Sequence, residues 1–143
     1  MFIGCCLLLV SCFDKGDCLY SNTSIVKVAL KDSIKTTTAK TITVANVHIP
    51  DEGVLYQDTV LSAFPLVIDP RTTETKFVFQ YGVRSDTLVL GYSNQTIVLA
   101  PECGSYMFQA GLEVKHSTFG KNKVIIRNKR LLKSVTLNID IFL

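Results

Sequence analysis

The fold is decided by residues 75–92, which read TKFVFQYGVRSDTLVLGY. In its first half, large apolar side chains stand at every second position, at Phe77, Phe79 and Tyr81. Such alternation is typical of a strand with one buried face. The segment Asp86–Tyr92 repeats the alternation after a four-residue connection. The stretch therefore predicts a β-hairpin.

Similar runs with a period of two recur on both sides of this hairpin, and turn residues separate them. No stretch combines a sustained helical period with capping residues. Further strands are expected at Ser24–Lys31, Thr41–Ile49, Phe64–Ile68, Thr96–Ala100, Tyr106–Ala110 running on toward Lys115, Lys123–Arg127 and Ser134–Leu143. The last run places five apolar side chains on one face: Val135, Leu137, Ile139, Ile141 and Leu143. About eight or nine strands over residues 24–143 predict an all-β fold, an antiparallel β-sandwich of immunoglobulin-like type.

The N-terminal segment has the pattern of an export signal. Residues 1–11 contain no charged side chain. Their apolar run is too short to span a bilayer, which needs about 20 apolar residues, and fits a signal peptide instead. The run ends in Leu-Val-Ser followed by Cys12, which resembles the bacterial lipobox. In that motif the cysteine thiol receives a diacylglyceryl group, and the acylated cysteine becomes the new N-terminus. We therefore expect a lipoprotein signal peptide at 1–11 and a lipidated, palmitate-bearing N-terminus with a linker at 12–23.

The expected lipoprotein signal assigns different roles to the five cysteines. Cys5 and Cys6 would leave with the signal peptide, and Cys12 would carry the lipid. Cys18 and Cys103 remain, and two thiols in an exported protein indicate a disulfide. Closing so long a loop contributes about 4–5 kcal/mol in the chain-entropy model. The competing interpretation is a zinc site built from the first four cysteines, which lacks a paired C-x-x-C and a following histidine at ligand spacing.

Motifs for catalysis or metal binding are not found in the sequence. There is no G-x-S-x-G, H-E-x-x-H or phosphate-binding loop, and no alternating Asp/Asn calcium loop. The two histidines, His48 and His116, are far apart in the sequence. Ser117 adjoins His116, but neighbours along a strand point to opposite faces. The sequence therefore predicts a protein that is not an enzyme, with no cofactor and no metal ligand.

The net charge of +3 is distributed unevenly along the chain. Residues 12–114 hold eight basic and eleven acidic side chains, whereas residues 115–143 hold seven basic and one acidic. Six of the basic residues surround the loop between the last two predicted strands: Lys121, Lys123, Arg127, Lys129, Arg130 and Lys133. This basic cluster would suit an anionic surface such as lipid headgroups, polysaccharide or an acidic partner. The alternative is a solvated loop whose charge keeps the protein soluble. Nucleic acid is not expected, because no aromatic stacking platform accompanies the cluster.

Several short motifs, taken in order, resemble a family of small Bacteroidota lipoproteins of unknown function, one of the numbered families of that kind. They are the lipobox at Cys12, Asp17-Cys18, Phe64-Pro65-Leu66, Ser85–Leu88, Ala100–Gly104 and Asn138–Leu143. The resemblance implies a single β-rich domain anchored by lipid, with no assigned catalytic residues.

Three Asp-Ser/Thr-apolar triplets look like the O-glycosylation acceptor pattern of exported Bacteroidota proteins. They begin at Asp32, Asp58 and Asp86. Ser33 and Thr59 are the stronger acceptor candidates, because we expect them nearer to loops.

These features predict a non-enzymatic envelope protein that binds an envelope protein or polysaccharide or supports an assembly. The residue after the anchor cysteine is Phe13. An Asp at this position would favour retention in the inner membrane, so Phe13 favours the outer membrane. The protein could lie on the periplasmic or the surface face of that membrane. The alternative is a carbohydrate-binding module at the cell surface, which needs exposed aromatic side chains. Its candidates are Tyr20, Tyr56, Tyr92 and Tyr106. A hydrolase would instead need a histidine within hydrogen-bond reach of a serine or a carboxylate.

Overall fold

Two β-sheets form the protein in a computed structural model that describes residues 23–120 and 122–143. The signal peptide expected at 1–11 and the linker up to residue 22, with Cys12, Cys18 and Tyr20, lie outside the described residues. The five-stranded sheet has the order β3-β2-β5-β6-β7, and the four-stranded sheet has the order β4-β1-β9-β8. The strands are β1 Ile25–Lys31, β2 Ile42–Ile49, β3 Gly53–Leu61, β4 Ala63–Val67, β5 Glu74–Tyr81, β6 Arg84–Ala100, β7 Gly104–Ser117, β8 Val124–Ile126 and β9 Ile139–Phe142.

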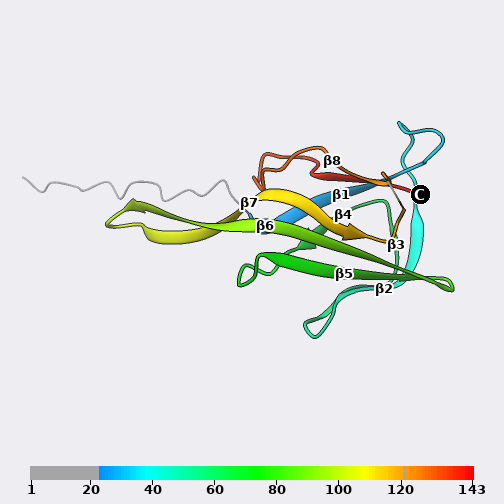
Figure 1. The fold of residues 1–143 in the computed structure, drawn as a ribbon, viewed down its shortest axis with the longest axis horizontal. Coiled ribbons are helices and arrows are strands. Elements are labelled where there is room, and N and C mark those ends of the chain that lie inside the picture. The colour runs from blue at the N-terminus through cyan, green and yellow to red at the C-terminus, as the bar shows by residue number, and fades with distance from the viewer. Residues whose placement is uncertain (1–22, 121) are drawn as a thin grey trace, which may run out of the picture.

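The sheets lie as two layers with the apolar core between them (Figure 1). Phe77 and Phe79 of β5 are completely buried in this core, as the alternation of residues 75–92 predicts. The ring of Phe79 meets Phe64 of the opposite sheet edge-on, with 6.2 Å between ring centroids. It meets Phe119 in the same way at 5.3 Å. Burial of alternate side chains from two facing sheets is the arrangement of a β-sandwich, and the predicted all-β sandwich is confirmed.

The hairpin predicted from residues 75–92 is formed by β5 and β6. Tyr81 pairs with Arg84, so the turn between them consists of Gly82 and Val83 alone, shorter than the expected four-residue connection. Gly82 has a φ of 56°. A left-handed residue at this position is what a tight hairpin turn needs to match the twist of its strands.

β6 is longer than expected, because the runs predicted at 86–92 and 96–100 are one continuous strand of 17 residues. It pairs with β7 along most of that length. The outer half of this hairpin, residues 93–110, is called the arm here. Figure 1 shows the arm extending beyond the rest of the sandwich. Two of its apolar side chains are strongly exposed, Val98 at 75% and Met107 at 56%.

One strand pair departs from the antiparallel arrangement, because β1 and β9 run parallel from Val28↔Ile139 to Lys31↔Phe142. The prediction of a strand over Ser134–Leu143 was too long, since β9 has four residues. The Asn138 side chain explains where the strand begins: its Nδ2 donates to the backbone oxygens of Asn128 and Arg130. These bonds hold residues 128–138 as a loop. Val135 and Leu137 therefore precede the strand and are only half-buried.

Strand β3 was not predicted. It is an edge strand that pairs with β2 alone, and five of its nine residues are exposed. Its sequence therefore lacks a clear apolar alternation. Thr59 lies on β3 opposite Val44, two residues before the strand ends at Leu61. Ser33 does lie in the connection from β1 to β2. Within the described residues, no helix is long and apolar enough to cross a membrane.

Candidate functional site

The structure divides the basic cluster that the sequence suggested. Lys121 lies outside the described residues. The Arg127 Nε donates to the Asp140 carboxylate at 2.6 Å, so its charge is compensated. The pKa of the Glu113 carboxyl is lowered mainly by the hydrogen bond from Lys115, and to a smaller extent by the nearby Lys129. Two further members are exposed on the loop from β8 to β9: Arg130 and Lys133.

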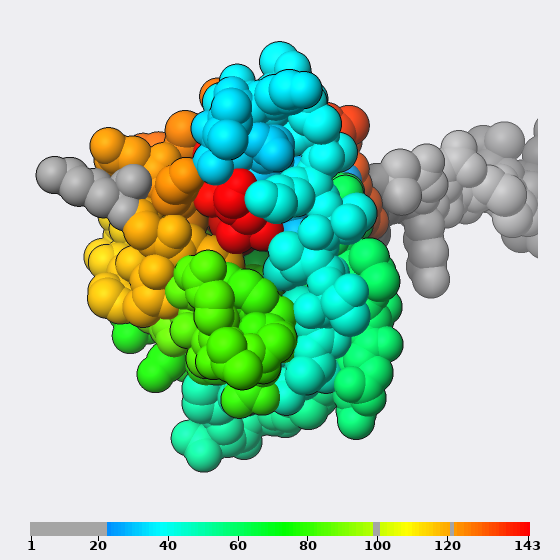
Figure 2. Space-filling view, turned by 90° about the vertical axis from the view of Figure 1, so that its right-hand side faces the viewer, coloured from blue at the N-terminus to red at the C-terminus, as the bar shows by residue number. Residues whose placement is uncertain are grey.

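Lys123, the remaining member, joins a different group of cations at one end of the sandwich. There it lines a pocket of about 380 Å³ together with Lys40 and Arg84. We call this the end pocket. Its other lining residues are Ile42, Tyr81, Phe119, Phe142 and Leu143. Figure 2 faces this end and shows the red C-terminal residues between the cyan chain around β2 and the green β5–β6 turn.

The three cations of the end pocket come from separate segments of the chain. Lys40 precedes β2, Arg84 opens β6, and Lys123 precedes β8. The side chains below them are apolar or aromatic. A pocket with an apolar floor and a few convergent charged groups is the usual form of a small-ligand site, and its cations favour an anionic ligand.

A buried carboxylate holds one wall of the pocket in place. Asp86 is 4% exposed and accepts hydrogen bonds from the hydroxyl of Tyr81 and, at 2.8 Å, from Thr118 Oγ1. Arg84 Nη2 lies 3.5 Å from the same carboxylate, and its guanidinium lies 5.6 Å from the centre of the Tyr81 ring. Burial, and after it the hydrogen bond to Asp86, raise the pKa of Tyr81 to about 12. Tyr81 therefore remains a neutral hydrogen-bond donor at physiological pH.

The other two cations lie near different groups of the chain. Lys40 Nζ donates to the backbone oxygen of Leu143 at 3.1 Å. The pKa of Asp32 is lowered mainly by the backbone N–H groups of Lys35 and Ile34, and more weakly by Lys40 and Lys123. Asp32 therefore offsets part of the charge of Lys40 and Lys123, as Asp86 does for Arg84.

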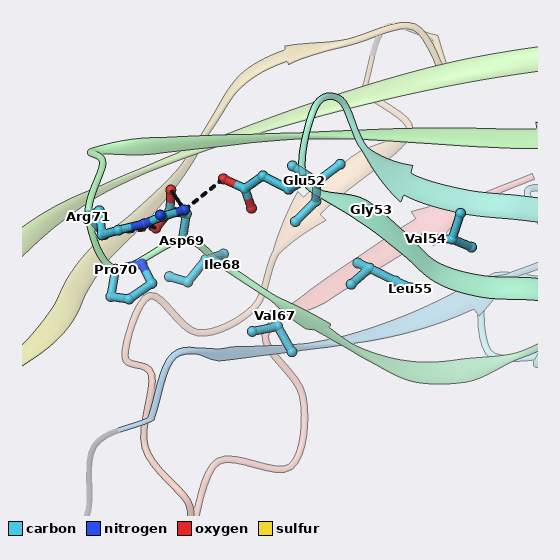
Figure 3. A pocket seen from close by; sticks show the side chains of 10 residues that line it. Glu52, Gly53, Val54, Leu55, Val67, Ile68, Asp69, Pro70 and Arg71 are labelled. Atoms are coloured by element: carbon cyan, nitrogen blue, oxygen red, sulfur yellow. Dashed lines mark hydrogen bonds and ion pairs between the residues drawn. The ribbon is translucent and has the colours of Figure 1, made fainter.

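A second pocket, of about 390 Å³, lies between the start of β3 and the connection from β4 to β5. Figure 3 shows Arg71 reaching two carboxylates there, with Nε 2.8 Å from Asp69 and Nη2 3.2 Å from Glu52. The hydrogen bonds from Arg71 lower the pKa of Asp69 to about 2. Because two carboxylates compensate this guanidinium, the arrangement serves as a clamp between two loops.

The tyrosines proposed for carbohydrate binding do not come together. Tyr92 is buried, and its hydroxyl donates to the backbone oxygen of Asp69. Tyr56 lies on β3 and Tyr106 on β7, the opposite edges of the five-stranded sheet. Tyr20 lies outside the described residues. The described tyrosines therefore form no common stacking surface.

The histidines are equally separate. His48 Nδ1 lies 2.7 Å from Asn46 Oδ1, and His116 is exposed on β7. Within the described chain, no hydrogen bond joins either ring to a serine or a carboxylate. The same part of the chain holds no group of three His, Cys, Asp or Glu side chains placed to bind a metal ion. Cys103 lies in the turn at the tip of the arm, and Cys18 lies outside the described residues, so their pairing stays a prediction.

Sequence reasoning found Lys123 but missed its partners Lys40, Arg84 and Tyr81. The three missed residues are far from Lys123 along the chain, and only the pairing of the strands brings them to one end. No local signal in the sequence would have joined them.

A family model matches residues 41–143, a segment that contains β2 to β9 and all of the end pocket except Lys40. The chain belongs to DUF6452, a family of unknown function. No curated protein and no solved structure matches the chain. The DUF6452 match confirms the expected membership of a numbered family of unknown function. The Bacteroidota origin and the lipid anchor stay predictions.

Proposed function

We propose that this DUF6452 protein is a non-enzymatic binding module of the cell envelope, and that its end pocket receives an anionic group of another envelope component. One observation carries the proposal: Lys40, Arg84 and Lys123 meet over an apolar floor although the chain supplies them from three separate segments. Cations drawn together in this way concentrate positive potential in a concave surface. The ligand group is a carboxylate or phosphate carried by a polysaccharide or a protein.

The location rests on the N-terminal sequence. The lipobox supports acylation of Cys12, residues 12–23 connect the anchor to the sandwich, and Phe13 supports the outer membrane. A disulfide between Cys18 and Cys103 belongs to the same proposal, since an exported chain retains these two thiols. Intact mass of the protein extracted from membranes gives the test. Acylated Cys12 and two oxidised thiols are expected, and two free thiols would refute the disulfide.

The end pocket is tested by charge reversal. In the double variant Lys40→Glu/Lys123→Glu, two of the three cations become anions, whereas the Arg84–Asp86 contact that holds the wall is left intact. The probes are inorganic phosphate and polygalacturonate. Their binding is measured by NMR of the backbone amides of the protein in detergent. We expect both probes to shift the amides around Lys40, Arg84 and Lys123, and the double variant to bind at least about tenfold more weakly, because close charges contribute strongly in a partly desolvated pocket.

The matched control is Lys129→Glu/Lys133→Glu, which makes the same change of net charge outside the pocket. Its affinity should stay within about twofold of the wild type. Equal losses in the two variants would show that only the net charge matters. If neither probe shifts the pocket amides, the proposed site is wrong.

A further inference from the structure

The two most exposed large apolar side chains of the described residues stand beside the end pocket. Val83 is fully exposed in the turn between β5 and β6, directly before Arg84 of the pocket. Ile34 is 90% exposed in the connection from β1 to β2. Figure 2 shows this connection, in blue and cyan, and the green β5–β6 turn on opposite sides of the red C-terminal residues. We call Ile34 and Val83 the apolar tips.

Hydrogen bonds hold the Ile34 tip next to the cations of the pocket. The N–H of Ile34 donates to Asp32 Oδ1 at 2.7 Å, a turn in which the aspartate side chain fixes its own loop. Lys40 lies near enough to act on the charge of the same carboxylate. The N–H of Ser33 donates at 3.0 Å to the backbone oxygen of Leu143, which also accepts the bond from Lys40 Nζ. The tip therefore has a defined position beside the pocket.

The surface at this end of the molecule is hollowed beyond the end pocket itself. A pocket of about 300 Å³ adjoins the end pocket, since Lys123 and Phe142 line both. It lies beside the connection from β1 to β2, because Ser33 is part of its lining. Ile125 adds an exposed apolar side chain to this lining. The end of the sandwich thus combines projecting apolar tips with a concave, positively charged surface.

This combination selects among the partners that could carry the anionic group. An exposed aliphatic side chain strengthens binding only when the partner covers it with apolar surface. A polysaccharide presents mainly hydroxyl groups, so the apolar tips would gain little from it. A bilayer would cover the tips, but a projecting segment fills a hollow better than a flat surface does. A protein segment can present a carboxylate to the cations and apolar side chains to the tips at the same time.

We propose that the partner of the end pocket is a protein. A projecting segment of that protein places an Asp or Glu carboxylate among the three cations, and apolar side chains beside this carboxylate pack on Ile34 and Val83. The proposal rests on the proposed function and narrows its ligand to a carboxylate that a protein carries. Because both tips are exposed, they contribute little to the stability of the fold, and replacing them affects binding alone.

The partner class is tested by photo-cross-linking of the full chain in cells that produce it naturally. The photoreactive residue p-benzoylphenylalanine replaces Ile34 or Val83, and the control position is Val54, which is 58% exposed and lies opposite His48, far along β2 from the pocket. We expect both tips to form an adduct with the same protein, and Val54 to form less than about a tenth as much, because cross-linking requires contact. Adducts with phospholipid or polysaccharide instead of protein, no adduct from either tip, or equal yields from Val54 would overturn the proposal.

A second measurement examines the carboxylate. With the photoreactive residue at Val83, the changes Lys40→Glu/Lys123→Glu should lower the yield of the protein adduct at least about tenfold, since the cations bind the partner's carboxylate. An unchanged yield would show that no carboxylate of the partner enters the pocket, and the proposal would be wrong. The phosphate titration does not involve the tips and reports on the proposed function separately. If phosphate shifts the pocket amides but neither tip gives a protein adduct, the proposed function stands and this proposal fails.

Discussion

The long hairpin of β6 and β7 has two halves that differ in what covers them. In the half within the sandwich, Leu88, Leu90 and Leu112 are completely buried. In the arm, Ile97 is only half-buried and Val98 is largely exposed, although both are as apolar as the buried residues. The same pair of strands thus contributes to the core only where the second sheet lies across it. Backbone pairing continues into the arm without the burial that stabilises the body.

The largest effect is expected from removing an aromatic ring in the body. Phe79→Ala deletes a completely buried ring that contacts Phe64 and Phe119, and should lower the free energy of unfolding by about 3–5 kcal/mol. Phe108→Ala, the matched change in the arm, removes a half-buried ring and should cost less than about 1 kcal/mol. Urea unfolding followed by circular dichroism measures both. Similar losses would mean that the arm shares the stability of the body.

The difference between body and arm also limits what the sequence predicts. Alternation at Phe77 and Phe79 identified the core correctly, because both side chains face the opposite sheet. Alternation at Val135 and Leu137 was equally clear, yet these residues lie in a loop that Asn138 holds with its side-chain amide. A local pattern shows which side chains suit a strand. It does not show whether another sheet covers them or a side chain competes for the backbone.

A smaller effect is expected where the body meets the arm. The buried hydroxyl of Tyr92 donates to Asp69 O at 2.6 Å and lies 2.6 Å from Thr75 Oγ1. Tyr92→Phe removes one hydrogen bond from each of these buried groups, and should lower the free energy of unfolding by about 1–3 kcal/mol. Tyr56→Phe is the control, since its hydroxyl bonds to Pro65 O at an exposed position and water can replace it. Thermal unfolding distinguishes the two, and equal shifts in Tm would show that burial of the Tyr92 hydroxyl does not matter.

The candidate site was harder to predict than the core for the same reason. Lys123 stood out because basic residues are dense in its part of the sequence, but density placed it with Lys129 and Lys133. In the structure it lies with Lys40 and Arg84, which only the strand order brings near. Long-range pairing therefore decides which charges meet.

The smallest effect is expected on the loss of stability in acid, to which a carboxylate of the body and one of the arm should contribute differently. Hydrogen bonds from Arg71 lower the pKa of Asp69 from 3.8 to about 2, so the folded protein binds fewer protons at this carboxyl than the unfolded chain does. The resulting stabilisation is present above about pH 4 and is lost as the pH falls through about 2. Asp69→Asn should therefore flatten the decline of unfolding free energy between pH 4 and pH 2, measured by urea titrations at each pH. Glu102→Gln removes an exposed carboxylate at the tip of the arm and should leave that decline as steep as in the wild type. If it flattens the decline as much as Asp69→Asn does, acid sensitivity belongs to the carboxylates in general and the Arg71 clamp contributes nothing of its own.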